Sequence, residues 1–189
     1  KRGSIGRPLP GISVRTVHTD TGEVLPQGEP GLLQVRGVNI MKGYLSEPEK
    51  TARVLQNGWY STGDIASIDE EGFIYITDRL ARFSKIAGEM VPHGKVEEVL
   101  HELLGAPEQV LAVTGVPDQA RGERLVVLHT LPNGQLEDLI DRLDKTDLPN
   151  LWKPRLNAFY RVDAIPVLGT GKTDLKAVKA LASKLDQGE

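Results

Sequence analysis

The sequence contains no cysteine, and this absence excludes several kinds of chemistry. Disulfide bonds, thiolate metal sites and a cysteine nucleophile all need that side chain. The histidines are few and scattered, and no two of them have the spacing of metal ligands on one helix face: His18, His93, His101 and His129. We therefore expect no metal-binding residues in this chain.

Long apolar runs and an excess of positive charge are also missing. No stretch approaches the roughly 20 apolar residues that a membrane-spanning helix needs, and no signal peptide is visible. The 23 Lys and Arg residues stand against 26 Asp and Glu residues, so the formal net charge is −3. Because nucleic-acid-binding domains carry a strong basic patch, we expect a soluble protein that does not bind nucleic acid.

The length of 189 residues fits one domain or two small ones. The chain starts at Lys1 without a methionine and passes directly into a segment rich in glycine and proline, Gly3–Gly11. We expect it to be a piece of a longer polypeptide, whose localisation has to be inferred by other means.

Short strands separated by Gly, Pro and Asp turns are predicted for the N-terminal part of the chain. They are expected at residues 13–19, 31–37, 64–68 and 73–77, with a short helix at 48–55. The segment Asp69–Gly72, between the last two strands, has the composition of a hairpin turn. Residues 1–80 are therefore predicted to form a small β-barrel-like subdomain.

From Phe83 onward the apolar residues follow helical spacing. Five of them precede Gly105, which suits a helix end: Val96, Val99, Leu100, Leu103 and Leu104. Further helices are expected at 135–145 and, with Asp174 as N-cap, at 174–185; strands are expected at 109–116, 124–131 and 158–162. Residues 81–189 are therefore predicted to form a compact α+β domain, and the fold class of the whole chain is α+β.

Two segments near the predicted domain boundary carry side chains suited to nucleotide chemistry. In Gly58–Asp64 an acidic residue follows a glycine turn, and its carboxylate can accept hydrogen bonds from two vicinal hydroxyls. The junction Asp78–Val91 places cations before a second glycine turn, where they can hold phosphates while the junction works as a hinge. Each segment alone also fits a plain role, as a hairpin turn or as a solvated linker.

A third segment contains Lys172 between small residues, ahead of the last predicted helix. A lysine there is a mobile point charge for a phosphate or a carboxylate. Gly171-Lys172-Thr173 imitates the end of a P-loop, but the full pattern needs a glycine where Pro166 stands, and proline offers no amide donor. A P-loop nucleotidase is therefore disfavoured, and a flexible loop is the plain alternative.

The order and spacing of these segments resemble the acyl-adenylate-forming superfamily, which includes acyl-CoA synthetases, luciferases and peptide-synthetase adenylation domains. The resemblance extends over essentially the whole chain and rests on these segments: Gly28–Gly31, Val35–Gly37, Asn39–Tyr44, Trp59–Asp64, Arg79–Gly88 and Gly169–Lys172. Within the superfamily, Lys85–Val91 is most similar to bacterial 2-acylglycerophosphoethanolamine acyltransferase/acyl-[acyl-carrier-protein] synthetases.

The resemblance implies a ligase that uses ATP and Mg²⁺ to convert a fatty acid into an acyl-adenylate and then passes the acyl group to a thiol. By motif position, Asp64 would bind the ribose hydroxyls with the help of Arg79. Lys172 would be catalytic, contacting the α-phosphate and the substrate carboxylate.

The same resemblance implies a rotation of the C-terminal domain between the two steps, about a hinge at Arg82. After the rotation, Lys85 would act as a second catalytic residue and Gly88 would line the thiol channel. The chain departs from the family pattern at the hinge, which is usually Asp or Lys. It also retains only the second acid, Glu97, of a frequent Glu-X-Glu pattern.

The narrower resemblance implies that the acceptor is the phosphopantetheine thiol of an acyl carrier protein, with onward transfer to a lysophospholipid. It places the parent enzyme at the cytoplasmic face of the bacterial inner membrane. Two alternatives stay open: an acyl-CoA synthetase with coenzyme A as acceptor, and a non-catalytic module that binds a carrier protein.

The phosphate loop rich in Ser, Thr and Gly, and the Tyr-Gly-X-Thr-Glu type segment, do not occur in the sequence. In the family they bind the ATP phosphates and Mg²⁺, and the acyl pocket is built around them. We expect them upstream of Lys1, and we expect that the 189-residue chain cannot form an adenylate alone.

Overall fold

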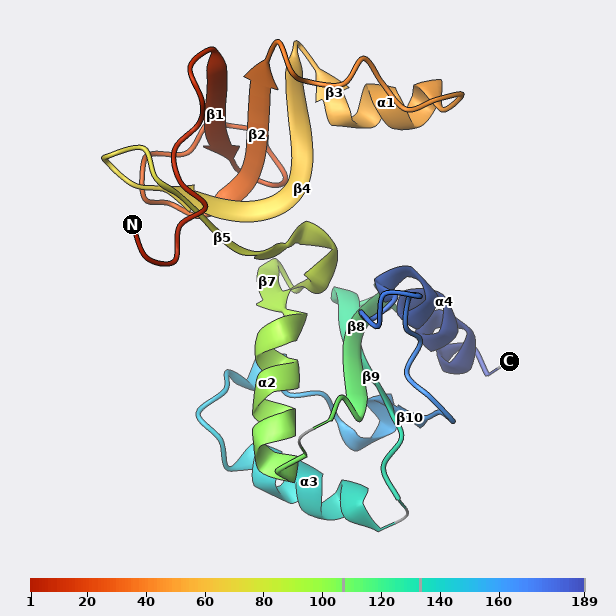
Figure 1. Cartoon of the computed structure of the whole chain (residues 1–189). Helices are drawn as coiled ribbons and strands as arrows, with labels where there is room; N and C mark the ends of the chain where they lie inside the picture. Colours follow the sequence, from red (N-terminus) through yellow and green to blue (C-terminus); the bar gives the residue numbers. More distant parts are fainter. Residues whose placement is uncertain (107, 133, 189) are drawn as a thin grey trace. The chain divides into compact units, whose positions relative to one another are not determined.

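The computed structural model describes residues 1–106, 108–132 and 134–188. The chain divides into two compact units, Lys1–Leu80 (unit 1) and Ala81–Glu189 (unit 2), and the short 3-10 helix η1, Leu80–Arg82, spans the division (Figure 1). No described helix combines the length and the apolar character that crossing a membrane requires.

Unit 1 is built on one antiparallel sheet. Its elements are β1 (Ile12–Val17), β2 (Gly31–Gly37), the helix α1 (Pro48–Val54), β3 (Leu55–Gln56), β4 (Trp59–Ile68) and β5 (Ile74–Arg79). The strands follow the order β1-β2-β4-β3, and β5 pairs with β4. Strand β4 bends sharply, so the sheet curls into a half-barrel (Figure 1). The curl encloses a small apolar core: Leu33, Ala66, Ile68 and Ile74.

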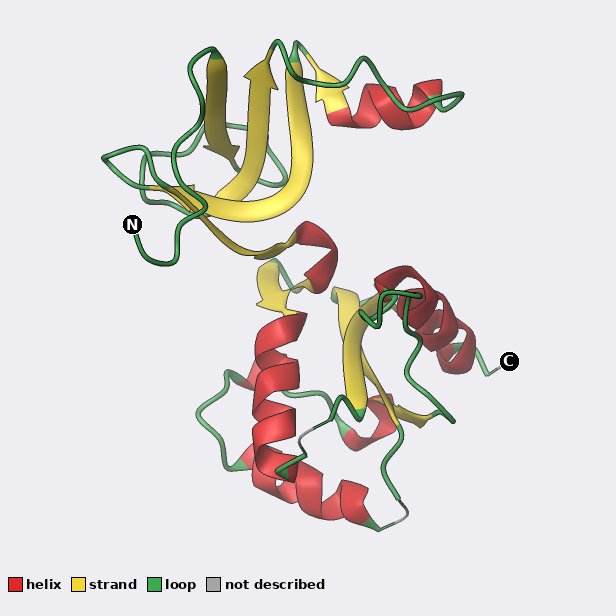
Figure 2. Ribbon diagram, viewed as in Figure 1, coloured by secondary structure: helices red, strands yellow, loops and turns green. Residues whose placement is uncertain are grey.

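Unit 2 mixes helices with a second five-stranded sheet (Figure 2). In chain order it contains β6 (Phe83–Ile86), β7 (Glu89–Pro92), α2 (His93–Leu104), β8 (Leu111–Asp118), β9 (Gly122–His129), α3 (Gln135–Asp144), η2 (Asn150–Trp152), η3 (Leu156–Ala158), β10 (Phe159–Arg161) and α4 (Leu175–Asp186). The strands follow the order β10-β9-β6-β7, with β8 on β9. Among the described strand pairs of this sheet, β9–β10 is parallel and the others are antiparallel.

Successive side chains of a strand point to opposite faces, so the β8–β9 hairpin presents apolar side chains on both of its faces. Helices cover each face. Leu111, Val113 and Val127 pack with residues of α2 and α3, including Leu100 and Leu139. On the other face, a second apolar cluster joins the hairpin to α4: Ala112, Val116, Val126, Leu128, Ile165, Val178 and Ala182. Unit 2 is thus a helix–sheet–helix sandwich, and the predicted α+β class is confirmed.

The structure differs from the sequence-based expectations in two places that concern the candidate site. Asp64 was expected at the start of a strand after a glycine turn, but β4 already begins at Trp59 and Asp64 lies inside it. For the residues after Arg82 only a glycine-containing turn was expected, whereas strands β6 and β7 form a hairpin around that turn.

Candidate functional site

The first group of candidate residues lies where β4 and β5 pair in unit 1. Asp64 and Arg79 face each other in the register, and Arg79 Nε lies 3.0 Å from Asp64 Oδ1. Gly63 has φ +79° and lies within an irregularity of the β2–β4 pairing, and the Asp64 amide donates to Thr62 Oγ1 at 3.1 Å. Irregularities of this kind re-aim side chains, and here the Asp64 side chain stays 18% exposed.

Two tyrosines border this pair. A hydrogen bond with Tyr44 raises the pKa of Tyr60, and burial and the nearby Asp64 charge act in the same direction. The Tyr60 phenol therefore stays protonated at neutral pH. The result is a carboxylate, a guanidinium and two hydroxyls close together, which suits a ligand with vicinal hydroxyl groups.

The second group is the turn of the β6–β7 hairpin in unit 2. Its two central residues, Ala87 (φ +49°) and Gly88 (φ +89°), both have positive φ, as a type I′ turn requires. Three hydrogen bonds fix the hairpin. The Lys85 amide donates to Glu123 Oε2 at 2.8 Å, the Ala87 amide to the Arg121 carbonyl at 2.8 Å, and Trp152 Nε1 to Glu89 Oε1 at 2.7 Å.

Arg82 lies immediately before this hairpin and is tied to helix α2. Its guanidinium donates to Glu97 Oε2, while Glu97 Oε1 accepts the backbone amide of Val113 in β8 at 2.8 Å. The Glu97 side chain is only 12% exposed. The acid that remains from the Glu-X-Glu pattern thus connects the predicted hinge residue to the central hairpin of unit 2.

The third group is the loop that carries Lys172. The Leu168 amide donates to the Lys172 carbonyl at 2.7 Å, and the Gly171 amide donates to the Leu168 carbonyl at 2.8 Å. These bonds form a tight turn, with the Gly171 amide used inside it. Thr173 Oγ1 lies 2.7 Å from Gln109 Nε2 and 2.9 Å from its Oε1, which fixes the base of the loop.

The Lys172 side chain itself is exposed. Among the described residues, no hydrogen bond or ion pair holds its ammonium group. Helix α4 starts directly after the loop, and the Asp174 carboxylate caps it by accepting the amides of Lys176 and Ala177. Lys172 is therefore a mobile cation on a well-anchored base.

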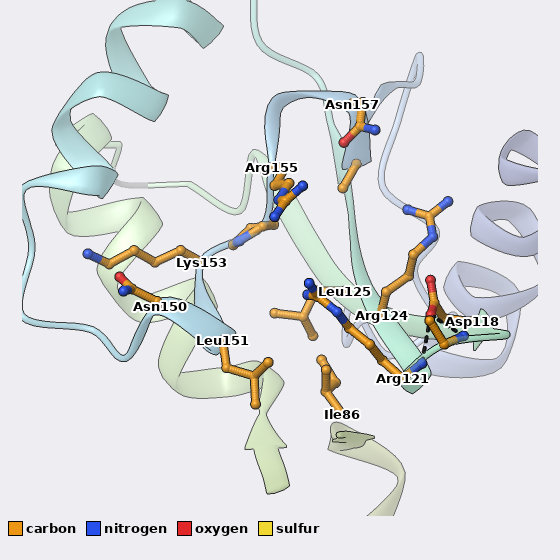
Figure 3. A pocket seen from close by; sticks show the side chains of 13 residues that line it. Ile86, Asp118, Arg121, Arg124, Leu125, Asn150, Leu151, Lys153, Arg155 and Asn157 are labelled. Carbon is orange, nitrogen blue, oxygen red and sulfur yellow. Dashed lines mark hydrogen bonds between the residues drawn. The ribbon is translucent and has the colours of Figure 1, made fainter. Parts of the chain in front are cut away.

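Sequence reasoning missed a pocket of about 610 Å³ next to the β6–β7 hairpin (Figure 3). Ile86 belongs to its wall, together with four cationic residues from β9, from the turn before it and from the segment after η2: Arg121, Arg124, Lys153 and Arg155. The two pairs Arg121/Arg124 and Lys153/Arg155 are far apart in the sequence, so no local pattern could have indicated that they share one pocket.

The four cations are not equally available to a ligand. Arg124 pairs with Asp186. The Lys153 ammonium donates to the carbonyls of Asp144 and Thr146, and in Figure 3 its side chain extends away from the arginines. For Arg121 and Arg155, the described part of the chain offers no carboxylate partner. These two guanidinium groups are suited to bind phosphate.

The structure brings some of the predicted residues together within each unit. Asp64 and Arg79 form a pair within unit 1, and Lys85 and Gly88 lie on one hairpin beside the pocket of unit 2. Among the described residues, no group of three or more His, Asp or Glu side chains is arranged to hold a metal ion.

Comparison with known proteins gives a consistent picture. Residues 1–45 match the family described as AMP-binding enzyme. A long-chain-fatty-acid–CoA ligase of Bacillus subtilis is 37% identical over 174 residues, which cover 91% of this chain and 30% of that protein. The chain is thus similar to AMP-binding enzymes over its first 45 residues and to this fatty-acid–CoA ligase over most of its own length.

Two solved structures resemble the chain over nearly its whole length. ATP-bound MatB from Rhodopseudomonas palustris has a TM-score of 0.74 at 28% identity, covering 97% of this chain and 36% of that one. The o-succinylbenzoate CoA synthetase MenE of B. subtilis, in complex with its acyl-adenylate intermediate, has a TM-score of 0.68 at 28% identity, with coverages of 95% and 36%.

The chain spans about a third of the length of these three proteins. Both the fatty-acid ligase and MenE are named for coenzyme A, and they are named for different acids. These relatives do not show the narrower similarity to acyl-[acyl-carrier-protein] synthetases, and they favour the coenzyme A alternative.

Proposed function

We propose that this chain supplies the C-terminal part of an ATP-dependent, AMP-forming acid–CoA ligase. The relationship to AMP-binding enzymes supports adenylate chemistry. The observation that carries the choice of acceptor is the position of the cationic pocket beside the Lys85–Gly88 turn. The acid we propose is a fatty acid, as in the related B. subtilis ligase.

The reaction has two steps. A carboxylate oxygen of the acid attacks the α-phosphorus of ATP, the bond to the leaving pyrophosphate breaks, and an acyl-adenylate forms. The sulfur of coenzyme A then attacks the acyl carbonyl carbon, the bond to AMP breaks, and the thiol proton is released to solvent. The products are a thioester and AMP.

Lys172 serves the first step, because its ammonium can offset the repulsion between the carboxylate and the α-phosphate. One preorganised group of this kind is typically worth about 10²–10³ in rate. Asp64 and Arg79 hold the ribose hydroxyls of the nucleotide.

The β6–β7 hairpin serves the second step, with Lys85 and Gly88 along the path of the thiol. The nucleotide part of coenzyme A carries a diphosphate and a 3′-phosphate, which need cationic partners. Arg121 and Arg155 offer them in the neighbouring pocket. The pantetheine arm itself is uncharged, so the two arginines should matter for coenzyme A and not for the arm alone.

Acceptor kinetics of the intact ligase test this proposal, with coenzyme A and pantetheine as alternative thiols. The double variant Arg121→Ala/Arg155→Ala is expected to raise the KM for coenzyme A roughly 10-fold to 100-fold, since a hydrogen bond to a charged group is worth about 1.5–3 kcal/mol. The KM for pantetheine should be unchanged. Arg142→Ala, on the exposed surface of α3, is the matched control.

An equal rise in both KM values would contradict a role in binding the nucleotide. A preference of the wild-type ligase for holo acyl carrier protein over coenzyme A would replace the acceptor proposed here. Absence of acyl-adenylate formation with a panel of fatty and aromatic acids would contradict the ligase function itself.

A further inference from the structure

We infer that Glu97 is a positioning residue for the thioester-forming step, because it clamps the hinge residue Arg82 to the central hairpin of unit 2. The inference rests on the proposed function. Its basis is one nearly buried carboxylate that contacts both a guanidinium at the start of unit 2 and a backbone amide of β8.

The two oxygens of Glu97 have separate tasks. Oε1 accepts the Val113 amide at 2.8 Å, and Oε2 accepts the Arg82 guanidinium. Val113 is 2% exposed and belongs to the main apolar core of unit 2. The backbone amide of a core strand is held in place by its neighbours. Because Glu97 binds this amide and Arg82 together, the Arg82 side chain has a fixed position relative to the core.

Helix α2 holds the clamp in place by a second contact of the same kind. His101, one turn after Glu97, lies on the same helix face, and its Nε2 faces the Val110 amide at 3.3 Å. Its Nδ1 lies 2.8 Å from the Glu97 carbonyl. The acidic side chain is thus one of two groups by which α2 binds backbone amides in and next to β8, and its position is set by the helix.

What the clamp fixes is the start of the β6–β7 hairpin. Phe83, the first residue of β6, directly follows Arg82, and the Ala87–Gly88 turn lies at the end of the same short strand. The Lys172 loop is anchored elsewhere, by Thr173 on Gln109 and by the cap of α4. Release of Arg82 should therefore disturb the hairpin more than the Lys172 loop.

The groups that surround the Arg82–Glu97 pair are themselves buried. Ser84 and His93, which are 1% and 4% exposed, lie 2.8 Å apart. Burial lowers the pKa of His93, and the nearby positive charge of Arg82 lowers it further. Charged groups are costly to bury unless they are paired. The Glu97 carboxylate pairs with Arg82 and holds its side chain in one defined position.

Glu97→Gln separates the two tasks of the side chain in the intact ligase. The amide oxygen of glutamine can still accept from Val113, but the charge that holds Arg82 is lost. We expect the single-turnover rate of thioester formation from preformed acyl-adenylate to fall roughly tenfold, while ATP–pyrophosphate exchange is little changed. Glu98→Gln, which breaks only an exposed pair with Lys95 on the same helix, is the control.

A second set of variants distinguishes a specific role of the Arg82–Glu97 pair from a general loss of structure. Arg82→Lys, which keeps the positive charge, should retain more thioester formation than Arg82→Gln. The double variant Arg82→Gln/Glu97→Gln should be no slower than Arg82→Gln alone, because both changes break one interaction. Equal losses in exchange and in thioester formation, or additive losses in the double variant, would overturn the inference. A wild-type ligase without exchange activity would instead overturn the proposed function.

Discussion

The hydroxyl of Ser84 and Nε2 of His93 lie 2.8 Å apart in the interior of unit 2, where the two residues are 1% and 4% exposed. Burial lowers the pKa of His93 from its ordinary value of 6.5 to about 4, and the charges of Arg82 and Lys179 act in the same direction. The imidazole is therefore neutral in the folded protein at physiological pH.

This pKa shift predicts that acid destabilises unit 2. Between pH 6.5 and pH 4 the unfolded chain binds a proton at His93 that the folded chain does not bind, so the free energy of unfolding falls as the pH falls through this range. The full loss from His93 is about 3 kcal/mol. The contribution of neutral His93 to the free energy of unfolding is fully present above pH 6.5 and is lost toward pH 4.

Urea denaturation at several pH values measures this effect. In a Trp59→Phe background, the fluorescence of Trp152 reports on unit 2 alone. In His93→Gln the amide can still form a hydrogen bond with Ser84, and the free energy of unfolding should change less with pH. A smaller slope should remain from His129, whose pKa burial and Arg161 also lower. The prediction is wrong if the slope is as steep in His93→Gln as in the wild type.

Gly115 is predicted to tolerate no side chain. A Cβ at this position of β8 would lie 1.8 Å from Ser84 Oγ and 3.0 Å from Ser84 Cβ. Because that hydroxyl is buried and bonded to His93, Gly115→Ala should lower the free energy of unfolding by roughly 1–3 kcal/mol. In a Ser84→Ala background the same change should cost less. Gly169→Ala, which meets no atom within 4 Å, is the control.

Ala87 is the first residue of the β6–β7 turn, and its replacement by asparagine is predicted to stabilise the protein. Ala87 has φ +49°, a conformation that costs energy for alanine, and the type I′ turn favours Asn-Gly. Ala87→Asn should raise the free energy of unfolding by roughly 0.5–1 kcal/mol. Ala120→Asn, at an exposed alanine without positive φ, should give no such gain in urea denaturation. A loss of stability in Ala87→Asn would show that the turn depends on the small side chain.

Asp64 is predicted to act on nucleotide affinity and hardly on stability. Its partner Arg79 is 66% exposed, so the ion pair should contribute less than about 1 kcal/mol to folding. In the intact ligase, Asp64→Asn should raise the KM for ATP roughly 10-fold to 100-fold. Glu70→Gln, an exposed acid of the same unit, controls for the change in charge. An unaltered KM for ATP would remove Asp64 from the proposed nucleotide site.

Elements with strong local signals could be predicted from the sequence. Strand β2 has the predicted bounds, Gly31–Gly37, because a glycine stands at each end. Helix α4 follows Asp174, whose carboxylate caps it as expected. Gly105 ends α2 in the left-handed conformation. In each case, one residue type determines the local backbone.

The features that the sequence did not reveal depend on tertiary contacts. The β6–β7 hairpin has an Ala-Gly turn without the usual signal, and it is fixed by Glu123, Arg121 and Trp152 from distant segments. The cationic pocket is assembled in the same way. The role of Glu97 was left open in the sequence because its partner Val113 contributes only a backbone amide, which no residue pattern can indicate.

The central claim, that this chain takes part in acyl-adenylate formation, is tested most directly by ATP–pyrophosphate exchange in the intact ligase with a panel of fatty acids. Lys172→Ala should lower the exchange rate by roughly 10²–10³. Lys176→Ala, an exposed lysine on the following helix, should leave it unchanged. Exchange at the wild-type rate in Lys172→Ala would contradict the account.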